Sequence, residues 1–199
     1  AGRAVLAPAT FDLHRLLEDM ELMFRVRTEA KGLGLLVERT GEVPRWVNTD
    51  EGKLRQVLIN LVGNAVKFTE EGGIALRIGA RGAEKETIDL LFEVEDTGPG
   101  IAENEIERVF NAFEQTSTGI RSGGTGLGLA LSQGFVMIMG GELPLGSTVG
   151  KGSIFRFTVP VREGREDLAE KSKARRNVLR LKPGREEILQ SHVVQVFLP

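Results

Sequence analysis

The chain has 199 residues, 41% of them hydrophobic, with 26 basic residues against 28 acidic ones and a formal charge of −2. That length can bury the core of one domain with extensions, and the even charge balance argues against a nucleic-acid-binding surface. The sequence has no cysteine, which excludes disulfide frameworks, thiolate zinc sites and cysteine nucleophiles. No apolar run is long enough to span a bilayer, and the N-terminal residues lack the apolar stretch expected of a secretory signal.

The N-terminal part of the chain predicts a helix followed by two short strands. Apolar residues recur at spacings of three and four up to about Ala30, in a helix that Thr10 or Asp12 can cap. Short strands are expected at residues 35–39 and 46–48, on either side of a glycine- and proline-containing turn. A second helix then begins.

This second helix, residues 53–68 with Asp50 as its cap, carries an unusual polar stripe. Asn60 and Asn64 lie one turn apart opposite the apolar face, and Lys67 follows them. Asparagine is a poor helix former, so two aligned amides near an ammonium group suggest side chains held toward a ligand. A phosphate-bound magnesium ion would suit them, because Mg²⁺ takes one or two protein oxygens and leaves its other positions to phosphate and water. The alternative is an ordinary amphipathic helix with a solvated side.

The rest of the chain mixes strands and helices without a regular β-α-β alternation. In order we expect strands at 74–80 and 88–95 joined by a hairpin at 81–86, a helix at 103–110, a polar loop at 115–124, a helix at 127–139, and strands at 142–147 and 153–161. The polar loop has little to bury and is typical of a flexible lid. The pattern predicts an α+β domain over residues 1–161, a two-layer α/β sandwich in which helices back a mixed, mostly antiparallel sheet.

Beyond residue 161 the composition changes. Residues 162–187 contain nine basic and six acidic residues and are interpreted as a charged linker, helical around residues 166–176. Residues 188–199 form a separate β-prone tail to which we assign no role.

Asp96 ends a predicted buried strand and is followed by Gly98 and Gly100. Such a segment is most often a plain turn. As a ligand group, the carboxylate would accept a hydrogen bond from the exocyclic amine of adenine and would meet an acceptor carbonyl in guanine, so it would select the base. The glycines would let the backbone approach the ligand.

A second glycine-rich stretch, residues 123–128, stands where the polar loop becomes a helix. Unpaired amides and the positive end of the helix dipole favour phosphate there. The stretch lacks the Gly-Lys-Ser/Thr of a Walker A loop and is not the dinucleotide fingerprint that follows a strand. Phe110 and Phe113 are expected to pack as the hinge of the loop. Arg121 could reach a terminal phosphate, and Ser153 could add a hydroxyl near the base.

The sequence contains five segments whose order and separation closely resemble the N, G1, F, G2 and final glycine boxes of the histidine kinase catalytic ATP-binding domain: NLVGNAVKF, DTGPG, the Phe110/Phe113 pair, GGTGLGL and GKGSIF. The resemblance runs from Thr10 to Val161. It implies the Bergerat ATP-binding fold, with ATP and Mg²⁺ between the asparagine helix and the lid. It also implies transfer of the γ-phosphoryl group to a histidine on a separate dimerisation domain, by positioning and charge neutralisation and with no protein nucleophile in this chain.

The same resemblance assigns roles to individual residues. Asn64, with Asn60 beside it, would hold magnesium, Lys67 and Arg121 would meet phosphates, and Asp96 would bind the adenine amine. The residues expected to bind the nucleotide are Asn60, Asn64, Lys67, Asp96, Gly98, Gly100, Ile101, Arg121, Gly124, Thr125, Gly126, Leu127, Gly128 and Ser153.

The phosphoacceptor box of this family, a histidine followed by an acidic residue, is absent, and His14 and His192 stand in other contexts. We therefore expect this chain to bind ATP without phosphorylating itself. The expected partners are the dimerisation domain of the same parent protein and a response-regulator receiver domain, with no nucleic acid. The parent is expected to be a homodimeric sensor kinase of the hybrid type, and this domain is expected in the cytoplasm whether or not the parent is membrane-anchored.

Two alternatives stay open. An ATPase of the gyrase or chaperone type would use a glutamate at the position of Asn60 to activate water, and no glutamate stands there. A degenerate module that serves as a docking domain without turnover would show no binding of magnesium ATP.

Overall fold

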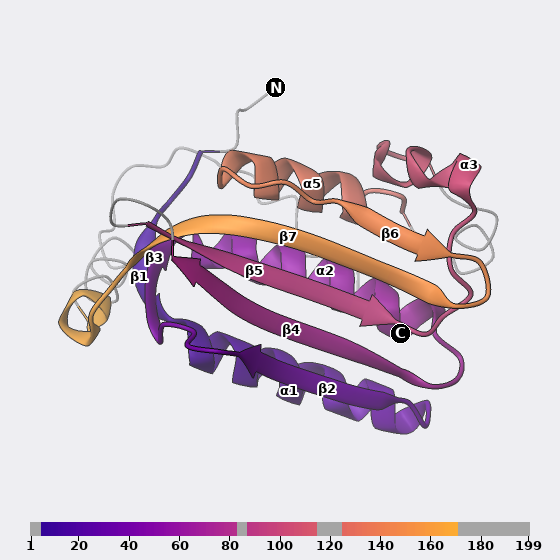
Figure 1. Ribbon diagram of the computed structural model, residues 1–199, viewed down its shortest axis with the longest axis horizontal. Coiled ribbons are helices and arrows are strands. Elements are labelled where there is room, and N and C mark those ends of the chain that lie inside the picture. Colours follow the sequence, from indigo (N-terminus) through magenta and orange to yellow (C-terminus); the bar gives the residue numbers. More distant parts are fainter. Residues whose placement is uncertain (1–4, 83–86, 115–124, 171–199) are drawn as a thin grey trace, which may run out of the picture.

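The computed structural model describes residues 5–82, 87–114 and 125–170. These residues form a seven-stranded sheet with helices packed on one face (Figure 1), which confirms the predicted two-layer α/β sandwich. In chain order the elements are β1 (Ala9–Asp12), α1 (Leu13–Ala30), β2 (Gly34–Thr40), β3 (Trp46–Thr49), α2 (Glu51–Phe68), β4 (Gly73–Gly82), β5 (Thr87–Asp96), α3 (Glu103–Ile106), the 3-10 helix η1 (Arg108–Phe110), α5 (Gly128–Ile138), β6 (Leu145–Thr148) and β7 (Gly152–Glu163). No helix among them is long and apolar enough to cross a membrane.

The sheet has the strand order β1-β3-β7-β5-β4-β2, with β6 beside the first half of β7. Strands β2 and β4 pair in parallel, and the other neighbours are antiparallel. The two short strands predicted around one turn, β2 and β3, are both present but lie in different parts of the sheet and do not pair with each other. Strand β1 was not predicted, since its four residues carry too little alternation to stand out.

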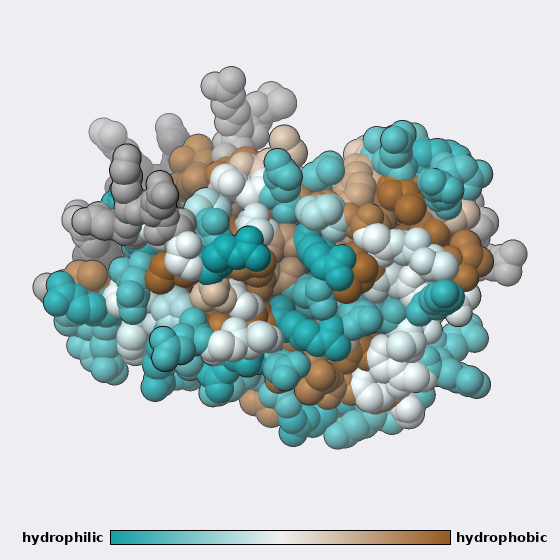
Figure 2. Space-filling model, in the orientation of Figure 1, coloured by the Kyte–Doolittle hydropathy of each residue, from teal (hydrophilic) through white to brown (hydrophobic). Residues whose placement is uncertain are grey.

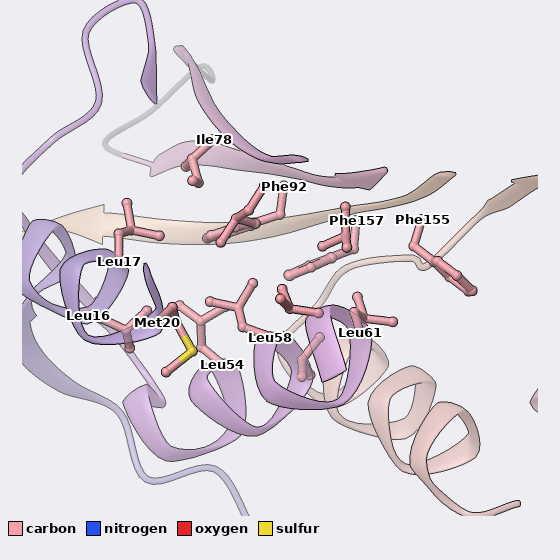
Figure 3. Close-up of a cluster of buried hydrophobic side chains, with 14 of the residues drawn as sticks. Leu16, Leu17, Met20, Leu54, Leu58, Leu61, Ile78, Phe92, Phe155 and Phe157 are labelled. Carbon is pink, nitrogen blue, oxygen red and sulfur yellow. The ribbon is translucent and has the colours of Figure 1, made fainter. Parts of the chain in front are cut away.

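The core lies between the sheet and helices α1 and α2 (Figure 3). Phe92 of β5 and Phe157 of β7 are buried neighbours whose rings stack with centroids 4.6 Å apart. The apolar face of α2 contributes Leu54, Leu58 and Leu61, each with no exposed surface. This packing places the opposite, polar face of α2 beside α5 and the end of β5.

The other face of the sheet is open to solvent. Figure 2 shows that hydrophilic side chains cover much of it. Arg77 of β4 binds Glu93 and Glu95 of β5 at 2.9 and 2.6 Å, and Arg156 of β7 binds Glu93 at 2.8 Å. Because these groups are partly exposed, each pair adds little to stability, but together they keep this face polar.

Both long helices begin at a predicted aspartate. Asp12 Oδ1 accepts from the Arg15 N–H at 3.1 Å, and Asp50 Oδ1 accepts from the Lys53 N–H at 3.0 Å. Thr10, the other candidate cap, lies within β1. Each helix therefore begins at a side chain that caps it through a local hydrogen bond.

Several boundaries differ from the predictions or cannot be compared with them. The helix expected at 103–110 is divided into α3 and η1, β6 starts three residues late, and β7 runs on to Glu163. Residues 166–170 are helical, as expected for the start of the linker helix. The tip of the predicted hairpin, the polar loop at 115–124 and all of the chain after residue 170 lie outside the described residues.

Candidate functional site

An open pocket of about 470 Å³ lies between the C-terminal half of α2, the end of β5, the start of α5 and the start of β7. That volume includes the solvent-filled space at the mouth of the pocket. The pocket brings together five residues that the sequence singled out, with five others. Its lining is Asn64, Ala65, Phe68, Asp96, Pro99, Gly100, Ile101, Leu129, Ser153 and Phe155.

Asp96 is the charged group of this pocket and is only 9% exposed. It stands at the end of β5, opposite Ser153 of β7 in the sheet register. Burial raises the pKa of the Asp96 carboxyl above its ordinary value, although hydrogen bonds from the N–H groups of Gly98 and Ser153 act in the opposite direction. A buried acceptor with so few partners is suited to a hydrogen-bond donor from a ligand.

The two glycines after Asp96 stand where a Cβ would crowd neighbouring atoms, and at Gly98 it would lie 2.8 Å from Asp96 Oδ1. The Gly98 N–H donates to Asp96 Oδ1 at 2.8 Å, which closes the turn. Gly100 has φ +71°, and a Cβ there would lie 2.2 Å from the carbonyl oxygen of Thr148. The plain turn that the sequence allowed is therefore present, and it also forms one wall of the pocket.

The two asparagines of α2 face different neighbours. Asn64 lines the pocket. Asn60 does not: its Nδ2 donates to Gly128 O and to Ser132 Oγ, both at 3.1 Å, and its Oδ1 accepts from Gln56 at 2.9 Å. The two amides, which the sequence predicted to face one ligand together, thus point to different places: Asn64 toward the pocket and Asn60 toward α5.

Lys67 continues the same stripe without lining the pocket. Its Nζ lies 5.2 Å from the centroid of the Phe68 ring, a cation-π contact. Phe68 is itself a wall of the pocket. The ammonium group is thus held near the site rather than in it.

The described part of the second glycine-rich stretch leads into α5. Arg121 and Gly124 lie outside the described residues, whereas residues 125–128 are described and do not line the pocket. Gly126 has φ +70°, and its carbonyl accepts from the Phe113 N–H at 3.1 Å. Helix α5 begins at Gly128, and the next residue, Leu129, lines the pocket.

The expected packing of the phenylalanine pair is only half right. Phe110 packs against the core, but Phe113 is 76% exposed and has φ +67°. The positive φ turns the Phe113 side chain outward while its N–H reaches Gly126. A spacing of three places two side chains on one side only within a regular helix, and Phe113 lies beyond the end of η1. The contact with Gly126 is therefore made by the backbone of Phe113 and not by its ring.

The apolar walls of the pocket were missed as site residues. Ala65 and Phe68 belong to the apolar side of α2, one and four residues after Asn64. Phe155 lies two residues after Ser153 in an alternating strand, so both side chains point to the same face. That alternation was a usable signal, whereas Leu129 and Pro99 could be placed only by tertiary packing.

The described residues contain no cluster of three or more histidine, aspartate or glutamate side chains able to hold a metal. Besides the oxygens of Asp96 and Ser153, the pocket offers the side-chain amide of Asn64 on α2. One neutral oxygen fits an ion whose remaining positions are filled by phosphates and water, which is how Mg²⁺ is usually held beside a nucleotide.

The model of the histidine kinase-, DNA gyrase B- and HSP90-like ATPase family matches residues 49–163, more than half of the chain. The chain belongs to this ATPase family. The match begins just before α2 and ends with β7, so it contains every element that lines the pocket. The family resemblance drawn from the five sequence segments is confirmed.

Within the family, similarity is to sensor kinases. Sensor protein GacS of Pseudomonas syringae pv. syringae is 37% identical over 172 residues, which are 85% of this chain and 19% of that protein. The aerobic respiration control sensor protein ArcB of Escherichia coli (strain K12) is 38% identical over 152 residues, 74% of this chain and 19% of that protein. The chain spans about a fifth of the length of the curated relatives it matches.

Solved structures agree with this assignment. Full-length ShkA in complex with AMPPNP superposes with a TM-score of 0.70 at 35% identity, covering 84% of this chain and 34% of ShkA. The nucleotide-free catalytic domain of the histidine kinase ThkA superposes with a TM-score of 0.60 at 26% identity, covering 77% of this chain and 97% of that domain. The fold is that of a histidine kinase catalytic domain.

Proposed function

We propose that this chain is the ATP-binding catalytic domain of a sensor histidine kinase. In this proposal it transfers the γ-phosphoryl group of ATP to a histidine on a dimerisation domain elsewhere in its parent protein. The observation that carries the proposal is one pocket lined by Asp96, Asn64 and Ser153, next to the first turn of α5.

The base would lie at the Asp96 end. The buried carboxylate would accept from the exocyclic amine of adenine, and Ser153 would offer a hydroxyl beside it. Ile101 and Phe155 supply apolar surface for the rings. Guanine would present a carbonyl to Asp96, so two acceptors would meet without a proton between them, which costs binding energy.

The phosphates would lie toward the first turn of α5. Backbone N–H groups of residues 125–128 and the positive end of the helix would face them, with Lys67 nearby. Asn64 would hold Mg²⁺, which when bound neutralises phosphate charge. The chain contributes orientation and exclusion of water around the reacting phosphoryl group, and the accepting histidine comes from outside it.

Further parts of the proposal concern the parent protein. The relatives GacS and ArcB are sensor proteins, and on that basis we infer a homodimeric hybrid kinase whose phosphoryl group passes on to a receiver domain. Because ATP is the proposed donor, the domain would work in the cytoplasm.

Isothermal titration with magnesium ATP and magnesium GTP tests the nucleotide site. We expect ATP to bind, and GTP to bind at least about tenfold more weakly, since the guanine carbonyl would face the Asp96 carboxylate and both are acceptors. Asp96→Asn should abolish this preference. Glu95→Gln makes the same chemical change one residue earlier, on the open face of the sheet, and should bind ATP as the unchanged chain does. No binding at millimolar ATP would favour a docking module instead.

A further inference from the structure

We propose that Asn60 is a positioning residue that fastens the first turn of α5 to α2. It would thereby set the position of the backbone that faces the nucleotide phosphates, rather than holding the metal ion. The inference rests on the proposed function, because it assigns a role within that nucleotide site.

The contacts of the Asn60 side chain leave little capacity for a ligand. Its Nδ2 has two N–H groups, and two acceptors lie at 3.1 Å, Gly128 O and Ser132 Oγ. Its Oδ1 accepts from Gln56 Nε2 at 2.9 Å. To bind a metal, this oxygen would have to give up or share its bond to Gln56 and turn away from α5.

The partner of Asn60 on α5 is itself fixed. Ser132 has no exposed surface, and its hydroxyl donates to Gly128 O at 2.9 Å while accepting from Asn60. The three groups form a closed set of hydrogen bonds in which each donor has an acceptor. Such a part-buried, satisfied set holds its members in one arrangement, so α5 is tied to α2 at its first turn.

That first turn is the part of α5 that belongs to the site. Leu129 lines the pocket, and the residues just before Gly128 carry the N–H groups proposed to face phosphate. On the other side of this segment, Gly126 is held by the Phe113 N–H. The segment between these two attachments is short, so loss of the Asn60 attachment should displace the phosphate end and leave the Asp96 end in place.

The two asparagines of the polar stripe would then have different roles, Asn64 facing the ligand and Asn60 holding α5. Asn64 lies one turn further along α2 and lines the pocket. In the part of the chain that the structure describes, no hydrogen bond engages its side-chain amide. Asn64 is therefore available to a ligand, whereas Asn60 is already used by the protein.

Asn60→Asp separates the two roles because they make opposite predictions for it. A carboxylate keeps an oxygen for Mg²⁺, so a metal-holding residue would retain or gain magnesium ATP affinity. If instead residue 60 acts by donating to Gly128 O and Ser132 Oγ, the substitution by aspartate removes both N–H donors and places a negative charge beside the Gly128 carbonyl. We expect Asn60→Asp to weaken ATP binding about tenfold and to leave AMP binding within about twofold, since AMP lacks the outer phosphates.

Ser132→Ala supplies the second variant and changes no group on α2. It should weaken ATP binding in the same direction with AMP binding kept, and combining it with Asn60→Asp should cost less than the sum of the two single changes, because both break one hydrogen-bonded set. Gln56→Ala is the matched control. It removes the bond to Asn60 Oδ1 but neither bond to α5, and should bind ATP normally.

Titrations of the full 199-residue chain with ATP and AMP, each at fixed magnesium, decide the matter. Unchanged ATP affinity in Ser132→Ala, or retained affinity in Asn60→Asp, would overturn the inference while the proposed function stands. A parallel loss of AMP and ATP binding would overturn it too, because that pattern indicates general damage to the fold. If the unsubstituted chain bound no ATP, the proposed function itself would fail.

Discussion

Asp96 places a charge where water is largely excluded, and the consequence is a pH dependence. Burial raises its pKa in the folded chain, so without a ligand its contribution to folding stability is greatest below the pKa of the unfolded chain and is lost as the pH rises through the folded value. A bound adenine amine would favour the ionised form. Binding should therefore weaken as the pH falls and Asp96 takes up a proton.

We expect the affinity for ATP to decrease below neutral pH more steeply in the unchanged chain than in Asp96→Asn. The phosphates of ATP titrate in both experiments, so their contribution cancels when the pH dependence of the affinity in one chain is subtracted from that in the other. Titration calorimetry from pH 7.5 down to pH 5 measures it. Parallel curves for the two chains would show that Asp96 does not contact the base.

Alanine substitutions at Gly100 and Gly150 distinguish the cost of backbone strain from the cost of steric overlap. Both have positive φ, +71° and +76°, but a Cβ at Gly100 would lie 2.2 Å from Thr148 O, whereas nothing lies within 4 Å of one at Gly150. Gly150→Ala should cost about 1 kcal/mol of unfolding free energy, from the left-handed backbone alone. Gly100→Ala must also move the backbone of Thr148 and should cost at least about 2 kcal/mol. Urea denaturation tests this, and equal losses would contradict the close approach.

At the scale of the elements, Asp50 joins the segment before β1 to the start of α2. Its carboxylate accepts from the Lys53 N–H at 3.0 Å, the Lys53 ammonium at 2.7 Å and the Ala7 N–H at 2.9 Å. Burial tends to raise the pKa of Asp50, but these hydrogen bonds outweigh it and hold the pKa below the ordinary value. The stabilisation is therefore present above the ordinary pKa of aspartate and is lost as the pH falls through the lowered one.

Asp50→Ala should lower the unfolding free energy at pH 7 by about 1–2 kcal/mol, the usual effect of losing a helix cap. Asp50→Asn keeps an oxygen for the Lys53 N–H but loses the charge, so it should fall between Ala and the unchanged chain. The gap between Asp50→Asn and the unchanged chain should close in acid. Thermal unfolding at pH 7 and pH 3 measures both effects, and a gap that widens in acid would reverse the assigned sign.

The elements that sequence predicted correctly are those whose signals are local. The cap of α2, its apolar face and the alternation of β5 and β7 are each encoded within a few turns or residues. The parallel pairing of β2 with β4 and the separation of β2 from β3 depend on partners distant in sequence. The orientation of Asn60 belongs to this second class: spacing placed it on the polar stripe, but only the packing of α5 decides which neighbour it meets.

For the whole molecule, one sheet face is packed and the other stays open. The pocket lies at the edge of the packed layer, where α2 and α5 meet the strand ends. The ion pairs of Arg77 and Arg156 keep the open face polar. Family membership followed from the sequence segments, while the apolar walls of the pocket could be identified only from the packed layers.

Among the residues that the structure describes, the pocket is lined by no histidine, so phosphoryl transfer to a histidine should depend on a partner. Of the two histidines of this chain, His14 donates from Nε2 to the carbonyl of Val43 at 3.0 Å, so this ring nitrogen is already used within the fold. His192 lies outside the described residues.

We expect radiolabelled ATP to leave no acid-labile phosphate on this chain alone, and the double variant His14→Gln/His192→Gln to behave identically. Adding a dimerisation domain that carries the family's histidine should produce acid-labile label on that domain, reduced with Asp96→Asn and kept with Glu95→Gln. Label on the unaccompanied chain that disappears in the double variant would show instead that the site phosphorylates its own histidines.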